Sequence, residues 1–452
     1  MRPSFYLLLA MIVLCAEALI GQTSPPANSP SAGQFPATSP SQQTQSTATP
    51  GGKTLPPAVT IEQAIELAKK NNPALNANRT LITQNRAQET TANLRPNPML
   101  SWDTQYLPLF EPSLFSDSNY WETQAQYDVG IGYLFERGRK RQHRLQAAKD
   151  VTSVTESQVA DAERLTAANA AQQFIAALLA QSNLEFAHTV LDSFDQTVKI
   201  SEERYNAGAI SKADLLKIRL QRLQFQTDVN SAMLARSQAL ASLRQLMGFD
   251  SVPDNYETAG RLMYEPVQAK LENLQARALA LRPDLEAAKR SVTAAQSQID
   301  LAKANGKVDF DVSFNYTRLN QSNLGAFYFN VPLPVFNKNQ GEIARTQAAF
   351  SQSQFQETAA QQAVLTDVKT TYEALRRSED TVQLFDKGYL QEAQQSLEIT
   401  QFSYQHGAAS LLDFLDAERS YRSTEFTYRQ ALATYMNALE QLRLAVGTRD
   451  VQ

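Results

Sequence analysis

The feature that most constrains this chain is the length of its segments that contain neither glycine nor proline. Neither residue occurs in 139–207, 209–247 or 408–446, and 342–406 contains only Gly388. Alanine, glutamine, leucine, glutamate and arginine are frequent in these segments, and all five have high helix propensity. At 1.5 Å per residue, the first segment alone would form a helix of roughly 100 Å. A helix of that length needs packing partners along its axis, so we predict a mainly α-helical chain whose long helices form a coiled coil or bundle.

Composition excludes several functional classes. Glycine accounts for only 16 of 452 residues, which is few for an enzyme whose loops and phosphate-binding turns need positive φ. One cysteine and three histidines rule out a disulfide framework within the chain and a Cys/His metal cluster. The net charge of -4 lacks the basic excess expected of a nucleic-acid-binding protein. No catalytic motif is present either, so we predict a protein that is not an enzyme and has no cofactor or metal site.

Residues 1–21 have the pattern of a secretory signal peptide. Arg2 precedes an apolar run over 5–20, and small residues lie near its end. An uncleaved anchor helix and a lipid-modified Cys15 are the alternatives. Residues 22–58 are rich in proline, serine, threonine and glutamine and contain almost no large apolar side chain. Such a segment cannot bury enough surface to fold, so we predict a disordered linker before the folded part.

The folded part is predicted to consist of two repeats, 59–250 and 251–448. The segments Tyr205-Asn-Ala-Gly208 and Tyr404-Gln-His-Gly407 are separated by 404 − 205 = 199 residues, and the same offset relates Gly248 to Gly447. Each repeat is expected to run from a helix through two β-strands into a very long helix, a glycine turn and a returning helix. The predicted long helices are 139–206 and 340–405, and the predicted returning helices are 211–247 and 410–447.

A second similarity precedes the strands of each repeat. The segment Asn72-Pro-Ala-Leu75 resembles Arg282-Pro-Asp-Leu285. At the start of the first repeat, Thr60 is followed three residues later by Gln63, which is a capping-box pattern. We therefore predict that the first helix begins beside Thr60.

Four short segments alternate strictly between apolar and polar residues: 99–106, 122–133, 308–317 and 326–334. This period of two indicates β-strands with one apolar face. Strands of about 9–11 residues cross a bilayer when tilted, and aromatic apolar faces are typical of outer-membrane barrels. Backbone groups in lipid must all be paired, so four strands need completion by other subunits, and a trimer would supply 3 × 4 = 12 strands. A soluble sandwich packed on helices is the alternative.

The polar faces of these predicted strands carry carboxylates and neither lysine nor arginine. Threefold repetition would turn them into acidic rings that favour cations in a barrel lumen. The alternative is that they only solvate the pore. The residues concerned are Asp103, Asp128, Asp309 and Asp311.

The ordered set of these features resembles the TolC family of outer-membrane efflux ducts over nearly all of residues 59–448. The resemblance rests on the two Tyr-x-x-Gly turns, each followed by a serine and an aspartate. The segment 331–341, Val-Pro-Leu-Pro-Val-Phe-Asn-Lys-Asn-Gln-Gly, is similar to the end of a barrel strand in the family. Its form is more similar to the heavy-metal-efflux, CzcC-like branch than to the drug branch.

The resemblance implies a homotrimer whose 12-stranded β-barrel in the outer membrane continues into a 12-helix α-barrel in the periplasm. It also implies an equatorial belt formed by 59–72 and 249–272. The helix turns would meet a periplasmic adaptor (membrane fusion) protein and, through it, an inner-membrane pump of the RND type. The chain would then be the passive exit duct of a tripartite efflux system. A periplasmic coiled-coil scaffold or adaptor that does not span a membrane is the alternative, and the exported substrate stays open between metals, drugs and proteins.

Two carboxylates mark the start of the last predicted helix. Asp413 and Asp416 are three residues apart and therefore share a helix face. The family places acidic rings here to narrow the closed entrance, so the resemblance implies a periplasmic gate of Asp413 and Asp416, with Asp214 as the counterpart in the first repeat. Favourable charge at a helix N-terminus, after Ser410, is the alternative for Asp413.

The turns themselves are expected to be exposed and to contact the adaptor. The two glycines are predicted to supply the positive φ at which each helix pair reverses. The residues assigned to this contact are Tyr205, Gly208, Ala209, Ile210 and Ser211 in the first repeat, and Tyr404, Gly407, Ala408, Ala409 and Ser410 in the second.

Overall fold

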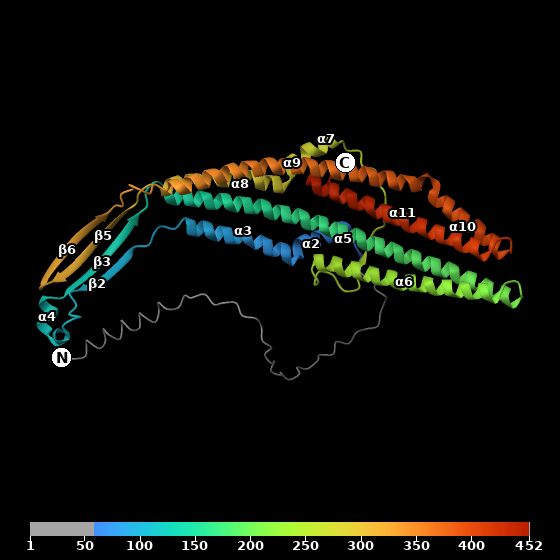
Figure 1. The fold of residues 1–452 in the computed structure, drawn as a ribbon, viewed down its shortest axis with the longest axis horizontal. Helices are drawn as coiled ribbons and strands as arrows, with labels where there is room; N and C mark the ends of the chain where they lie inside the picture. Colours follow the sequence, from blue (N-terminus) through green and yellow to red (C-terminus); the bar gives the residue numbers. More distant parts are fainter. Residues whose placement is uncertain (1–57, 452) are drawn as a thin grey trace. The chain divides into compact units, whose positions relative to one another are not determined.

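The structure is a computed structural model in which residues 58–451 are described. The predicted signal peptide, 1–21, lies outside the described residues, and so does the predicted linker up to residue 57. The described part is mostly α-helical and carries one four-stranded sheet (Figure 1), which confirms the predicted fold class. Within residues 58–451, no helix has both the length and the apolar composition needed to cross a membrane.

The first repeat begins with the predicted capping box. The side chain of Thr60 accepts from the Gln63 N–H at 3.3 Å, and the Gln63 side chain accepts from the Thr60 N–H at 3.0 Å, so this prediction is confirmed. The elements of this repeat are β1 (Ala58–Val59), α2 (Ile61–Asn71), α3 (Pro73–Ala92), β2 (Met99–Gln105), η1 (Pro112–Ser116), α4 (Ser118–Thr123), β3 (Gln126–Phe135), α5 (Lys140–Asn206) and α6 (Lys212–Met247).

The second repeat follows the same order, except that no helix lies between its two long strands and its long helix is broken. Its elements are β4 (Glu257–Thr258), α7 (Leu271–Leu281), α8 (Pro283–Asn305), β5 (Phe310–Leu319), β6 (Ser322–Asn330), α9 (Gln340–Leu384), η2 (Phe385–Tyr389), α10 (Leu390–Gln405) and α11 (Leu411–Val446). The single helix predicted over 340–405 is interrupted by the π-type turn η2, where Gly388 has a φ of 122°. Glycine tolerates this angle and a helix does not, so α9 and α10 are separate helices.

The four long strands form an antiparallel sheet in the order β2-β3-β5-β6. Its register places Trp102 opposite Val129 on one face and Asp103 opposite Asp128 on the other. In Figure 1 this sheet lies at one end of the described part, and the turns that follow α5 and α10 lie at the other end.

The boundaries of the predicted strands shift in the structure. The strand predicted over 122–133 begins at Gln126, because Asp117 caps α4 and draws the residues up to Thr123 into a helix. The strands predicted over 308–317 and 326–334 are joined by only two residues, Asn320 and Gln321, with φ of 48° and 63°. Both values are left-handed, as in the tight primed turns of hairpins, and they move β6 towards the turn.

Helix α5 is the common packing partner of both repeats. It packs against α2, α3 and α6 of its own repeat and against α8 and α11 of the second. Helix α8 also packs against α9, so it joins the long helices of the two repeats. Near the turns, an aromatic core of Phe194, Phe225, Tyr404 and Phe414 unites α5, α6, α10 and α11.

In each repeat, the segment that begins at Asn72 or Arg282 contacts the C-terminal end of the returning helix, which is followed by Gly248 or Gly447. The Asn72 side chain donates to the Leu246 carbonyl at 3.1 Å, and the Arg282 guanidinium donates to the Ala445 carbonyl at 3.3 Å. Directly after these carbonyls the chain turns at a glycine, Gly447 in the second repeat, with a φ of 83°. Each repeat therefore closes its last helix against the junction of its first two.

We expect Gly447→Ala to destabilise the protein by about 1–2 kcal/mol, because an L-residue is strained in the left-handed region. The new Cβ would also lie 3.3 Å from Arg282 Cγ. Gly341 is the matched control, since a Cβ there would meet no atom within 4 Å beyond the adjoining backbone of its own helix among the described residues, and its φ is not left-handed. Thermal unfolding in detergent should show a lower midpoint for Gly447→Ala only; equal midpoints would contradict this role of Gly447.

Candidate functional site

The polar face of the sheet is built around Asp128. This carboxylate is only 5% exposed and accepts from Gln126 Nε2 at 2.7 Å, Gln105 Nε2 at 3.3 Å and the Thr317 hydroxyl. Asp103 lies directly opposite on β2, an arrangement that is unfavourable for two like charges. Gln105 Nε2 also donates to Asp103 at 2.9 Å, so one amide links two of the four predicted lumenal carboxylates.

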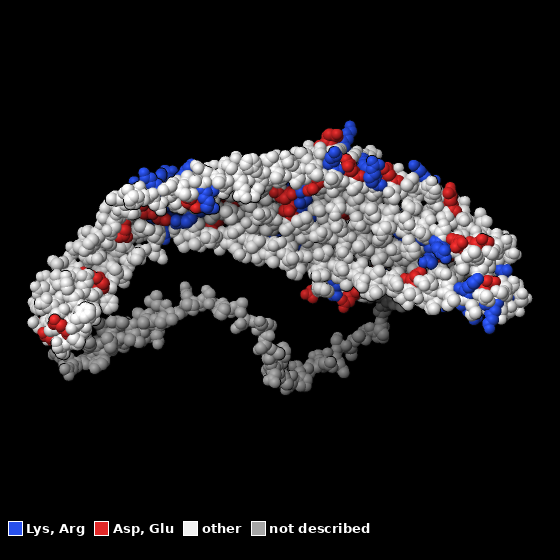
Figure 2. All heavy atoms as spheres, viewed as in Figure 1, with Lys and Arg blue, Asp and Glu red and all other residues white. Residues whose placement is uncertain are grey.

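The other face of the sheet is apolar and exposed. Trp102 is 58% exposed, Ile131 56% and Phe327 81%. Figure 2 shows that the strand end of the described part is mostly uncharged, whereas lysine, arginine and acidic side chains gather over the helices. Within residues 58–451, no strand pairs with the outer edges of β2 and β6. An aromatic face and two open edges match a sheet that is completed by further strands in an apolar medium.

The prediction for Asp309 is wrong in position. Strand β5 begins at Phe310, and Asp309 lies before it, where it accepts from Lys140 Nζ at 2.6 Å and from the Arg137 N–H at 2.8 Å. Its charge is matched by a cation at the start of α5, so Asp309 joins the sheet to the long helix. Asp311 does lie in β5, opposite Asn330 of β6. The strand also extends far enough to include Arg318, which the predicted boundaries had left out.

The two helix turns have the same construction. Gly208 and Gly407 have φ of 74° and 78°, which allows each helix to reverse within a few residues. Ser211 and Ser410 then cap the returning helices. Among the assigned turn residues, Ala209 and Ala408 are exposed.

The carboxylates beside these caps all have local partners. Asp413 accepts from the Ser410 hydroxyl at 2.7 Å and from its N–H at 3.1 Å, and these hydrogen bonds lower the pKa of Asp413. Asp214 accepts from the Ser211 hydroxyl at 2.8 Å. Asp416 lies 3.4 Å from Arg419, a partner that the sequence analysis did not consider.

Tyr404 is not a contact residue of the turn. It is 3% exposed, and its ring stacks on Phe414 with centroids 5.4 Å apart, whereas Tyr205 is 37% exposed. The assignment of Tyr404 to a docking surface is therefore wrong, because the ring belongs to the core between α5, α10 and α11. Arg204 covers this ring at 5.0 Å and donates to the Tyr404 carbonyl, so it ties the first turn to the second.

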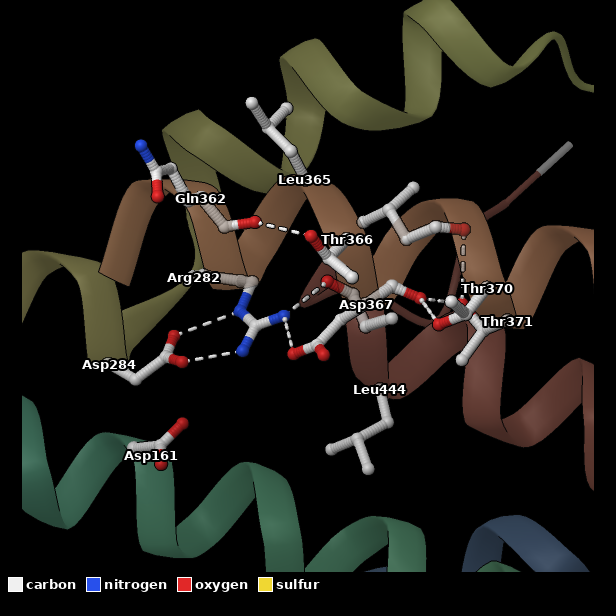
Figure 3. Close-up of polar contacts among 12 residues, drawn as sticks. Asp161, Arg282, Asp284, Gln362, Leu365, Thr366, Asp367, Thr370, Thr371 and Leu444 are labelled. Carbon is white, nitrogen blue, oxygen red and sulfur yellow. Dashed lines mark hydrogen bonds and ion pairs between the residues drawn. The ribbon is translucent and has the colours of Figure 1, made fainter. Parts of the chain in front are cut away.

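A buried guanidinium organises the middle of the molecule. Figure 3 shows Arg282, at the junction of α7 and α8, between the carboxylates of Asp284 and Asp367. Its Nε lies 3.0 Å from Asp284 Oδ1, and its Nη1 lies 3.1 Å from Asp367 Oδ2 on α9. From α5, Arg164 approaches Asp284 at 3.9 Å and donates to the Leu444 carbonyl of α11.

The protonation of this network follows from its geometry. Burial alone would raise the pKa of Asp284, but the hydrogen bonds and charge of Arg282, with the charge of Arg164, outweigh it and hold that pKa below its usual value. Burial lowers the pKa of Arg282 less than its two carboxylate partners raise it. The network therefore stays ionised and fixes α8 to α5, α9 and α11. Sequence analysis identified Arg282 only as part of a repeat.

Helices α3 and α6 of the first repeat have fewer packing partners than α8 and α11, their equivalents in the second repeat. Helix α8 packs on both α5 and α9, but α3 packs mainly on α5. Helix α11 packs on α5, while its equivalent α6 presents an exposed apolar stripe. The stripe consists of Leu216, Leu220, Leu223 and Leu234, which are 49%, 67%, 61% and 60% exposed. On α10, Ile399 and Phe402 are similarly exposed, at 67% and 62%.

Comparisons with known proteins agree on one family. A family model described as outer membrane efflux protein matches residues 64–249 and 274–448. The chain is 24% identical over 364 residues to the cobalt-zinc-cadmium resistance protein CzcC of Cupriavidus metallidurans, covering 80% of this chain and 84% of that protein. It is 22% identical over 430 residues to outer membrane protein TolC of Escherichia coli K12, covering 89% and 85%. A crystal structure of CusC is similar in fold, with a TM-score of 0.70 and 19% identity over 89% of this chain and 95% of that one.

We expect Arg282→Ala to destabilise the protein by roughly 2–4 kcal/mol, because it leaves two carboxylates without their buried cation. Arg345→Ala is the control, since Arg345 makes a similar two-point contact with Glu342 but on an exposed helix surface. It should leave stability unchanged. Thermal unfolding of both variants in detergent checks this, and similar midpoints would show that the network has no special role.

Proposed function

The chain belongs to the outer membrane efflux protein family, and from this premise we propose that three copies form the exit duct of a tripartite efflux system. The family consists of channel proteins, and this protein is an outer membrane efflux channel. The duct would receive its cargo from a periplasmic adaptor and an inner-membrane pump of the RND type. The observation that carries the proposal is the four-stranded sheet, whose apolar face is exposed and whose two outer edges have no partner within residues 58–451.

The repeat geometry supports assembly into a closed ring. Repeat two supplies α8 and α11 to one side of α5. By the same internal symmetry, a second copy would supply its α9 and α10 to α3 and α6 of the first. That contact would cover the leucine stripe of α6 with apolar residues such as Ile399 and Phe402. Such a head-to-tail contact also brings β6 of one copy beside β2 of the next, and repetition closes the ring.

We further propose that the cargo is cationic. The relative CzcC is named for resistance to cobalt, zinc and cadmium, and the segment 331–341 resembles the same branch. Asp103, Asp128 and Asp311 on the polar face of the sheet would form acidic rings in the lumen. The adaptor would dock on the exposed turns around Ala209 and Ala408.

The periplasmic entrance would be narrowed by the carboxylates of the second turn. Asp416 is the stronger candidate, because its side chain is 58% exposed and its contact with Arg419 is solvated. Asp413 is engaged by Ser410 but remains an exposed negative charge at the same turn. Asp214 would contribute less, because its side chain is only 37% exposed.

We expect Leu220→Asp to shift the purified protein from trimer to monomer, because it places a charge in the apolar stripe of α6. Gln221→Asp is the control, since the next residue of a helix points about 100° away from the stripe. Native mass spectrometry in detergent distinguishes the two species. A trimer that persists in Leu220→Asp would argue against the proposed contact.

Single-channel conductance in a planar bilayer tests the duct and its gate together. We expect small, cation-selective openings for the unmodified protein, and larger openings for the Asp413→Asn/Asp416→Asn variant, because the entrance loses its fixed charge. Asparagine at 413 can still accept from Ser410, so the variant should fold. Asp250→Asn, in the exposed loop after α6, should leave conductance unchanged. Equal conductance in all three proteins would move the gate elsewhere, and no channel from folded protein would overturn the duct.

A further inference from the structure

A cavity of about 500 Å³ lies between α5, α10 and α11, near the helix turns. This volume is in the range of sites that bind small organic molecules. One part of its wall is apolar and aromatic, formed by Phe186, Val190 and Phe194 on successive turns of α5, with Leu397 and Phe414 opposite. The function proposed above uses neither this cavity nor its lining residues.

The cavity is also acidic. Glu185, Glu398, Glu418 and Glu425 line it, and Arg429 is the one cation among its lining residues. Arg429 already has partners within the chain. It donates to Glu425 and to Ser182, and its guanidinium carbon lies 4.3 Å from the centre of the Phe186 ring. Gln181 donates to Glu185 at 3.2 Å, and Gln394 donates to Glu398 at 2.9 Å.

Glu418 differs from the other three carboxylates. It is 7% exposed, and its Oε1 finds no hydrogen-bond partner among the described residues. Arg422 Nε lies 3.7 Å away, which is too long for a hydrogen bond. That arginine instead donates to Asp228 of α6 at 2.8 Å and stacks on Phe225 at 4.5 Å. A buried carboxylate oxygen without a hydrogen bond is costly, and a cationic donor would relieve that cost.

The internal repeat shows what Glu418 lacks. An offset of 199 residues relates Glu418 to Arg219 of α6, and relates Gln401 to Glu202 of α5. In the first repeat Arg219 and Glu202 form an ion pair of 2.7 Å on the surface. In the second repeat the same two positions hold a carboxylate and a neutral amide, and both line the cavity. The second repeat therefore places a carboxylate here whose nearest cation, Arg422, lies 3.7 Å away without a hydrogen bond to it.

We propose that this cavity binds an organic monocation, with the cationic group beside Glu418 and an aromatic or aliphatic body against Phe186, Phe194 and Phe414. A cationic group would supply the missing partner of the carboxylate. The aromatic walls favour the same ligand class, since aromatic faces attract cations and bury flat apolar bodies. Because α5, α10 and α11 come from both repeats, the ligand would hold the second hairpin against the first.

The charge of Glu418 makes this binding depend on pH. Burial raises the pKa of Glu418 to about 7, against the charges of Arg422 and Arg419, and Asp228 adds to the rise. The acidic groups that line the same cavity are Glu185 on α5, Glu398 on α10 and Glu425 on α11, the last paired with Arg429. The ligand needs the ionised carboxylate, so its affinity should increase as the pH rises from 6 to 8.

The test is fluorescence titration of the purified full chain in detergent with ethidium, an aromatic monocation. We expect saturable binding that weakens at least about tenfold in Glu418→Gln, because the variant removes the buried charge that faces the cation. Glu392→Gln, on the exposed surface of α10, should bind as the unmodified protein does. Uncharged phenanthridine, the parent ring of ethidium, should bind the unmodified protein and Glu418→Gln equally.

Loss of fold cannot explain the expected result. A raised folded-state pKa means that Glu418 contributes stability below its ordinary pKa, and that this contribution is lost as pH rises through about 7. Glu418→Gln keeps a neutral side chain at every pH, so it should unfold no earlier than the unmodified protein above pH 7. Equal ethidium affinity in both proteins, or an affinity of the unmodified protein that does not change with pH, would overturn the proposal. Conduction by the duct would be unaffected by either outcome.

Discussion

The constraint on which the rest of this structure depends is the pairing of backbone groups at the edges of its sheet. Lipid offers no hydrogen bonds, so a sheet that crosses it must be closed. One chain supplies β2-β3-β5-β6 and leaves two edges unpaired within residues 58–451. Closure by further copies then sets where the long helices lie, because each strand pair leads directly into a long helix. The unmatched faces of α3 and α6 are the helical consequence of the same open edges.

Arg282, at the junction of α7 and α8, holds the helices of the second repeat together. Its guanidinium binds carboxylates of α8 and α9 and a carbonyl of α11, so three helices share one side chain. In the first repeat Asn72 occupies the equivalent place, where it donates to a carbonyl of α6 and caps α3 by accepting from the Leu75 N–H, without an ion pair. The second repeat, which packs on both α5 and α9 through α8, has the larger and charged connector. The two repeats share one fold but have different side chains at this junction, where their packing partners differ.

Much of the architecture could be predicted from local patterns. Runs without glycine or proline indicate helices such as α5, and strict alternation indicates strands, because both depend on near neighbours in the chain. The turn at Asn320 and Gln321 lacked the glycine that usually marks a primed hairpin. Tyr404, Arg204 and Glu418 were misassigned or missed because their environments come from helices about 200 residues away. No period in the sequence separates the exposed Tyr205 from the buried Tyr404.

The comparison of the two hairpins explains why the second one holds the chemically distinctive groups. On α6 the positions equivalent to Arg419 and Arg422 are Leu220 and Leu223, which form part of the exposed apolar stripe. On α11 these positions carry arginines, one of which reaches across to Asp228 of α6 within the same chain. The face that we propose to meet another copy is apolar, whereas the face that meets the same chain uses charge. Glu418 lies beside this charged face without a hydrogen bond to it, which is why its cavity remains available to a cation from solution.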